Sequence, residues 1–122
     1  RPNIHIKDMI NAYLLLLEQP DNKISKKIYN AGYENQKVFE LANIVKDVIG
    51  DDVKIIKKST NDNRSYHISS EKIKNDLGFI AKYTIKDAII DLKKAFDNKL
   101  LPKSLEDENY FNIKKMQSLN LK

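Results

Sequence analysis

Hydrophobic and polar positions alternate along the first part of the chain with the period of a strand and then of a helix. Ile4 and Ile6 fall on one face of a predicted strand over 3–6. Asp8 then stands where a helix N-cap is needed, and this helix is predicted to run to about Glu18. Because the helix is apolar around most of its circumference, we expect it to be buried on more than one side, or to expose a patch that a partner would cover. The apolar residues that share one of its faces are Ile10, Tyr13, Leu14 and Leu17.

The middle of the chain predicts three more strands around a second helix. The strands are predicted over 27–32, 53–57 and 64–68, with polar loops over 21–26 and 59–63. Asn35 stands at the N-cap position of the helix, and Gly50 closes it. The apolar positions that give this helix its i, i+3, i+4, i+7 pattern are Val38, Leu41, Ala42, Val45 and Ile49.

Two further helices are predicted towards the C-terminus. Ser69 or Ser70 caps a short helix that Gly78 stops. Thr84 and Asp87 resemble a capping box in which Asp replaces the usual Glu. The helix after this box has the clearest periodic signal in the sequence. Its apolar stripe is Ile85, Ala88, Ile89, Leu92, Ala95 and Phe96.

The predicted order is strand, helix, strand, helix, strand, strand, helix, helix. This order indicates α/β or α+β layering but no particular activity. Pro102 ends the compact part, so we expect one lobe over 1–101 and a C-terminal tail over 102–122 that can dock as a short helix.

Composition is that of one globular domain. The chain has 122 residues, of which 41% are hydrophobic and 32% charged. Its longest purely apolar run, 14–17, is far shorter than the roughly 20 residues that span a bilayer, so we expect no membrane partner. Cysteine is absent, which excludes disulfides and a thiol nucleophile and is compatible with a cytoplasmic location, the one we expect.

The net charge of +5 raises the hypothesis of nucleic-acid binding, which predicts a steep salt dependence of affinity. Twenty of the 22 basic residues are lysines interleaved with Asp and Glu, a pattern typical of a solvated surface, so we do not expect a nucleic-acid partner. The two arginines, Arg1 and Arg64, are more informative. Because arginine presents a rigid fork of donors suited to phosphate, these positions are candidate phosphate contacts.

Four motifs in order resemble those of the extended short-chain dehydrogenase/reductases, enzymes that act on nucleotide-diphosphate sugars. Residues 1–9 are similar to the pattern R-x-x-x-H-V-x-D, and Tyr29-Asn30-Ala31-Gly32 resembles F-N-x-G. Residues 63–73 resemble D-x-R-x-Y…D-x-S-K, and Leu77-Gly78-Phe79 follows as in the family. The resemblance covers about residues 1–97.

The resemblance implies that the chain is the C-terminal substrate-binding region of such a protein, with the Rossmann lobe missing. The positions it assigns to the substrate are Arg64 and Arg1, at the diphosphate, and Tyr66, beside the nucleotide. NAD or NADP would be held by the missing N-terminal lobe of the full-length parent, and none by this chain. A nucleotide-diphosphate sugar and the missing lobe are then the expected partners, with a homodimer also possible.

No catalytic or metal-binding residue is expected. Asp8 is interpreted as a helix cap, His5 and His67 as structural or solvent-facing, and Lys72 as structural. The chain has no G-x-x-G-x-x-G turn for a dinucleotide. The Tyr-x-x-x-Lys spacing of the family's catalytic pair occurs only where the sequence context does not match. These two occurrences are Tyr33/Lys37 and Tyr110/Lys114.

A second hypothesis from another class stays open. The chain could be a free-standing binding or protein-interaction module without catalytic activity. The sequence also leaves open which sugar and nucleotide are bound, and whether the parent epimerises, dehydrates or reduces.

Overall fold

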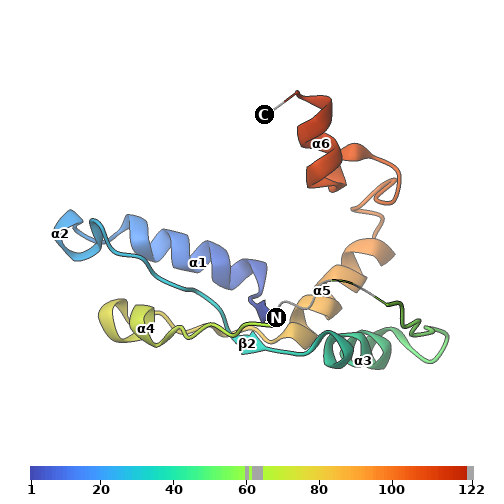
Figure 1. Ribbon diagram of the computed structural model, residues 1–122, viewed down its shortest axis with the longest axis horizontal. Helices are drawn as coiled ribbons and strands as arrows, with labels where there is room; N and C mark the ends of the chain where they lie inside the picture. Colours follow the sequence, from blue (N-terminus) through green and yellow to red (C-terminus); the bar gives the residue numbers. More distant parts are fainter. Residues whose placement is uncertain (60, 62–64, 121–122) are drawn as a thin grey trace. The chain divides into compact units, whose positions relative to one another are not determined.

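The structure is a computed structural model that describes residues 1–59, 61 and 65–120 (Figure 1). The chain forms two compact units, residues 1–91 and 92–122. The division falls inside a long helix, α5 (Ile85–Asp97).

The first unit is mostly helical, with one small sheet. The predicted α/β class therefore holds in the coarse sense that helices and strands share one domain. Its sheet has two antiparallel strands, β1 (Pro2–Asn3) and β2 (Glu34–Asn35), with Pro2 opposite Asn35 and Asn3 opposite Glu34. The helices are α1 (Ile6–Leu17), α2 (Asp21–Ile24), α3 (Val38–Ile49), α4 (Glu71–Leu77) and the first part of α5.

The start of α1 corrects two predictions. The strand predicted over 3–6 ends at Asn3, and the N-cap is His5, not Asp8. His5 has extended backbone, and its Nδ1 accepts a hydrogen bond of 3.1 Å from the Lys7 N–H. The helix is thus capped by the imidazole nitrogen of His5 and not by the Asp8 carboxylate. The Asp8 carboxylate instead accepts hydrogen bonds from the backbone N–H groups of Lys82 and Tyr83.

The core of the first unit lies under α1. Ala12, Ile73 and Phe79 are its buried residues. Residues packed partly against them are Ile4, Leu15, Tyr29, Ala31, Leu77 and Ala81. The buried face of α1 is therefore the one that carries Ala12, opposite the face on which Ile10, Tyr13, Leu14 and Leu17 were grouped from the sequence.

Three of the predicted strands do not form. Residues 27–32, 53–57 and 65–68 have no strand assignment, and position 64 lies outside the described residues. Asn35 is part of β2 instead of capping α3, whose N-cap is Lys37, with its N–H bound to the Glu40 carboxylate at 2.7 Å. The loop predicted over 21–26 contains the short helix α2, which begins after Pro20.

The signals at helix ends are confirmed in three places. Gly50 closes α3, and Gly78 closes α4 in the left-handed region at φ 75°. The capping box at α5 is present: the Thr84 N–H donates to Asp87 Oδ2 at 2.8 Å, and the Asp87 N–H donates to Thr84 Oγ1 at 3.1 Å. Such local patterns are readable from the sequence because both partners lie within one turn.

The second unit contains the end of α5, a 3-10 turn η1 (Glu108–Tyr110) and α6 (Asn112–Ser118). The ammonium of Lys115 contacts the Glu108 carboxylate at 3.0 Å, and this contact lowers the pKa of Glu108. The C-terminal tail thus contains a short helix, α6. None of the helices in the described part of the chain is long and apolar enough to cross a membrane.

Candidate functional site

Three extended segments that are distant in sequence lie together at the candidate site. β1 pairs with β2, and the chain remains paired at Arg1, whose carbonyl accepts a 3.0 Å bond from the Gln36 N–H. The Asn35 side-chain amide then binds the backbone of Ile68 twice, donating to its carbonyl at 3.0 Å and accepting from its N–H at 3.1 Å. Asn35 thus attaches the 65–68 segment to the sheet, as a neighbouring strand would.

This attachment brings together two of the residues predicted to bind substrate. The guanidinium carbon of Arg1 lies 5.8 Å from the centroid of the Tyr66 ring, within the range of a cation–π contact. Tyr66 is 53% exposed, and Arg1 is half-buried. The pair thus places a guanidinium over an aromatic ring, two kinds of group that proteins use to bind a phosphate and to stack on a base.

The third predicted residue, Arg64, lies outside the described residues. In the sequence it stands two positions before Tyr66. His67, next to Tyr66, is exposed, in agreement with the solvent-facing role expected for it.

A second pair of contacts holds the segment behind the site. The Ser70 hydroxyl accepts a 2.8 Å bond from the Gly32 N–H and donates a 2.9 Å bond to the Gly32 carbonyl. A Cβ on Gly32 would lie 2.6 Å from Cδ1 of Ile68, so a larger residue here would force the Ile68 side chain to move. Lys72 has the structural role expected: its ammonium donates to the Ile28 carbonyl at 2.8 Å and lies over the Tyr29 ring.

A buried polar cluster holds the first turn of α1. Asp8 is only 1% exposed, and its Oδ2 accepts 2.9 Å bonds from the N–H groups of both Lys82 and Tyr83. Its role is to join α1 to the segment before α5. Asp8 thus has a structural contact, but this contact is with residues 82 and 83 and is not the predicted helix cap.

His5 belongs to the same cluster. It is 4% exposed, its ring lies 4.9 Å from that of Tyr83, and its Nε2 is 3.6 Å from Asp91 Oδ2. The same carboxylate oxygen binds the Lys7 ammonium at 2.6 Å, which raises the pKa of Lys7. This charge arrangement holds the start of α1 against α5.

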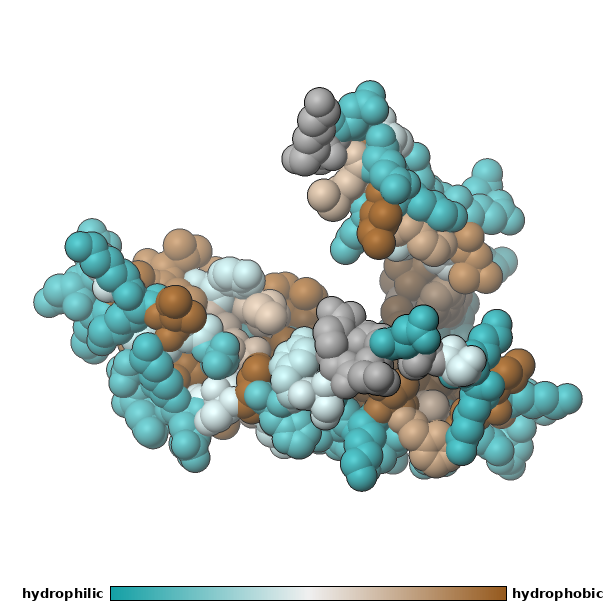
Figure 2. Space-filling model, in the orientation of Figure 1, coloured by the Kyte–Doolittle hydropathy of each residue, from teal (hydrophilic) through white to brown (hydrophobic). Residues whose placement is uncertain are grey.

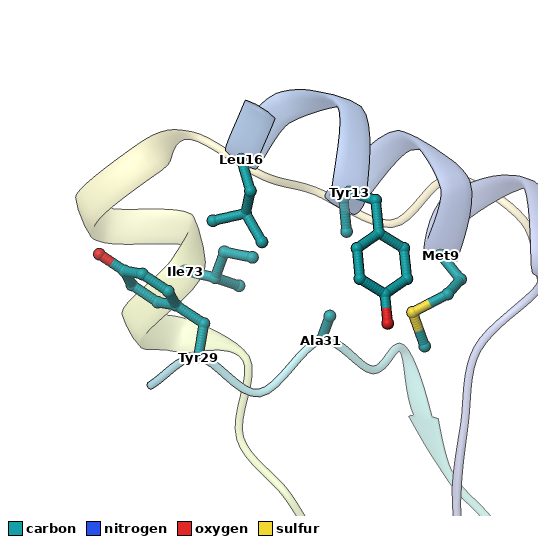
Figure 3. Close-up of a pocket in the computed structure, with 7 residues that line it drawn as sticks. Met9, Tyr13, Leu16, Tyr29, Ala31 and Ile73 are labelled. Atoms are coloured by element: carbon teal, nitrogen blue, oxygen red, sulfur yellow. The ribbon is translucent and has the colours of Figure 1, made fainter. Parts of the chain in front are cut away.

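A pocket of about 220 Å³ opens between α1, the 29–31 segment and α4 (Figure 3). Met9, Tyr13 and Leu16 point into it from α1, and Ile73 faces Leu16 from α4. On the opposite side Tyr29 donates a 3.1 Å hydrogen bond to Asp76, and its pKa is raised by partial burial and by this carboxylate. The lining is largely apolar, so the pocket fits an apolar side chain or group better than a phosphate.

The sequence has no glycine-rich turn for a dinucleotide, and the described residues contain no cluster of metal ligands. The chain's three glycines, Gly32, Gly50 and Gly78, lack the spacing of a pyrophosphate-binding turn. Among the described residues no group of three His, Cys, Asp or Glu side chains is placed to hold a metal. No step of hydride transfer is therefore assigned to this chain.

Comparisons with protein-family models, curated proteins and solved structures give no match to this chain. The interpretation of the site thus depends on the chain's own residues. Asn35 is the positioning residue that the sequence did not identify, since an Asn before a helix is read first as an N-cap. Asn35 also follows closely on the strand predicted over 27–32. That position is the sequence signal that favours binding to a neighbouring extended segment over capping a helix.

Proposed function

We propose that this chain is the substrate-binding part of an NAD(P)-dependent nucleotide-diphosphate-sugar epimerase, dehydratase or reductase. It clamps the diphosphate through Arg1 and Arg64, places Tyr66 beside the nucleotide and shapes the sugar pocket. The cofactor and the oxidation chemistry belong to a Rossmann lobe of the parent protein. The parent acts in the cytoplasm.

The observation that carries this proposal is the contact between Arg1 and Tyr66. The two residues come from separate motifs, 65 positions apart by their residue numbers, and both were assigned to the substrate on other grounds. The contacts between Ser70 and Gly32 support the same interpretation, because they join the second motif to the third. If the chain did not have the fold of this family, there would be no reason to expect a contact between Arg1 and Tyr66.

The test is a calorimetric titration of this chain with a nucleoside-diphosphate sugar and, separately, with the matching nucleoside. We expect weak binding that requires the diphosphate, reduced about tenfold or more in Arg64→Ala and partly restored in Arg64→Lys, because a guanidinium forms two charge-assisted bonds to phosphate. Lys57→Ala removes an exposed cation outside the site and is the matched control. Unchanged affinity in Arg64→Ala, or hydride transfer by this chain alone, would contradict the proposal.

The alternative, a protein-interaction module without an enzymatic parent, is favoured by one observation. On α1, Leu17 is 81% and Ile6 is 66% exposed, and Figure 2 shows hydrophobic surface over this helix. The reading frame upstream of Arg1 distinguishes the two: a glycine-rich strand–helix turn there supports the enzyme, and its absence supports the module.

A further inference from the structure

His5 is a buried titratable side chain that the proposed function does not use. Only 4% of its surface is exposed, and it lies between β1 and α1, where the extended chain turns into the helix. Its two ring nitrogens have different surroundings. Nδ1 accepts the 3.1 Å hydrogen bond from the Lys7 N–H, whereas Nε2 has no hydrogen-bond partner in the part of the chain that the structure describes.

The bond from Lys7 determines where the imidazole of His5 carries its proton. A neutral imidazole has one N–H donor and one acceptor nitrogen, and here the acceptor is Nδ1. The proton of the neutral ring is therefore on Nε2. A second proton must go to Nδ1, where it takes the lone pair that accepts from the Lys7 N–H. A protonated His5 therefore cannot cap α1 in this way.

Three carboxylates near the ring are possible partners for a protonated His5. Asp91 Oδ2 lies 3.6 Å from Nε2. Hydrogen bonds within the α5 capping box lower the pKa of Asp87 most, and the charge of His5 lowers it further, so this carboxylate also acts on the ring. Asp8 is buried on the same turn of α1, and its Oδ1 has no hydrogen-bond partner among the described residues.

Positive groups of α1 oppose an imidazolium at the cap position. The N-terminus of a helix carries the positive end of its dipole, and the Lys7 N–H would face the new N–H of His5. The Lys7 ammonium is also close, because it binds Asp91 Oδ2 at 2.6 Å. The remaining titratable group at the ring is Tyr83, whose ring lies 4.9 Å away. A protonated His5 is therefore repelled from the cap and attracted by the carboxylates.

We propose that His5 is a proton-dependent cap of α1: the neutral ring holds the first turn of the helix, and the imidazolium leaves the Lys7 N–H and binds the Asp91 carboxylate. This inference does not depend on the proposed function. The proton at Nδ1 comes from solvent, and only hydrogen bonds and ion pairs change. The part of the chain that loosens is the link between β1 and α1.

Nuclear magnetic resonance tests the proposal, because the chain has only two histidines and each ring can be followed separately. At about pH 8 the ¹⁵N shifts of the neutral His5 ring should show a protonated Nε2 and an unprotonated Nδ1. The pH is then lowered until both rings are protonated. The Lys7 amide signal should move with the ring signals of His5 and not with those of His67, which is exposed. The protection factor of this amide against hydrogen exchange should fall by about fivefold, the effect of losing a typical N-cap.

Two variants complete the test. His5→Asn keeps a good capping acceptor that does not titrate, so its Lys7 amide signal should stay in place over the same pH range. His67→Asn is the matched control and should leave the pH dependence of the Lys7 amide unchanged. A Lys7 amide that does not follow the His5 ring would overturn the proposal, as would a neutral ring protonated at Nδ1 or an unaltered pH dependence in His5→Asn. The signals of the unchanged chain decide the matter even if His5→Asn does not fold.

Discussion

The hydroxyl of Ser70 satisfies both backbone groups of Gly32, accepting from its N–H at 2.8 Å and donating to its carbonyl at 2.9 Å. A strand predicted over 27–32 would have met these needs with a partner strand. Here one side chain replaces two ladder bonds, and the residue that follows it, Glu71, begins α4. The segment behind the candidate site is thus held by a serine and not by a sheet.

Replacing this serine should weaken the fold. Ser70→Ala leaves two half-buried backbone groups without their partner, and we expect a loss of about 1–3 kcal/mol in the free energy of unfolding. Urea denaturation measures it. Ser25→Ala, at an exposed serine, is the control and should change stability by less than about 0.5 kcal/mol. Equal effects at both positions would show that the Ser70 contacts contribute nothing.

Glycine at position 32 leaves room for the Ile68 side chain. In Gly32→Ala the new Cβ would lie 2.6 Å from Ile68 Cδ1, so Ile68 must shift at a cost of about 1–3 kcal/mol. Ile68→Val removes the clashing methyl group. In a double-mutant cycle we expect Gly32→Ala to cost at least about 1 kcal/mol less in the Ile68→Val background, and additivity of the two changes would contradict this reason.

The Asp8 carboxylate should matter more than its place in a helix suggests. Asp8→Ala leaves the N–H groups of Lys82 and Tyr83 without their acceptor, and we expect a loss of about 2–4 kcal/mol. Asp8→Asn keeps an oxygen that can accept both bonds and should lose less. A thermal unfolding series of the two variants measures the difference, and equal losses would argue against the acceptor role.

The capping box at α5 predicts a dependence on acid pH. Hydrogen bonds from the Thr84 hydroxyl and N–H lower the pKa of Asp87 below its usual value. A carboxylate with a lowered pKa in the folded state contributes stability that is present above its unfolded pKa, about 3.9, and is lost as the pH falls through the folded pKa. The unfolding midpoint in urea should therefore decrease between pH 5 and pH 3 by more in the unchanged chain than in Asp87→Asn. An identical decrease in both would count against a contribution from the box.

The end of α5 offers a stabilising change. Lys99 has a φ of 56°, and the Leu100 N–H bonds the Ala95 carbonyl at 2.9 Å, the closure typical of a helix that ends in a left-handed residue. Lys99→Gly removes the strain of the Cβ, and we expect a gain of about 0.5–1 kcal/mol. Lys94→Gly, inside the same helix, should instead cost about 1 kcal/mol. Calorimetric unfolding of both variants measures the change in stability, which should be a gain for Lys99→Gly and a loss for Lys94→Gly.

The sequence predicted the local features of the fold well and the strands poorly. The Thr84–Asp87 box and the glycine that closes α3 were found because their partners lie within a few residues. The strands over 27–32 and 53–57 were wrong because an extended, apolar segment does not reveal whether another strand or a side chain will bind its backbone. Asn35 shows the difference: its amide, not a ladder, holds Ile68.

Arg1 and Tyr66 were predicted as substrate-binding residues from the sequence, and that role stays a prediction. Their proximity depends on the pairing of β1 with β2 and on the link to the 65–68 segment. The resemblance to the sugar-nucleotide enzymes stays a prediction, to be tested by the titrations above.

The sequence alone determined where α4 and α5 begin and where α3 and α4 end, since capping and periodicity operate within a few turns. Only the tertiary structure decided which face of α1 is buried. The apolar row of Ile10, Tyr13, Leu14 and Leu17 has the stronger pattern, yet the side with Asp8 and Ala12 faces the core. The reason is that two backbone N–H groups at positions 82 and 83 need the Asp8 carboxylate, and the small Ala12 allows Ile73 and Phe79 to approach.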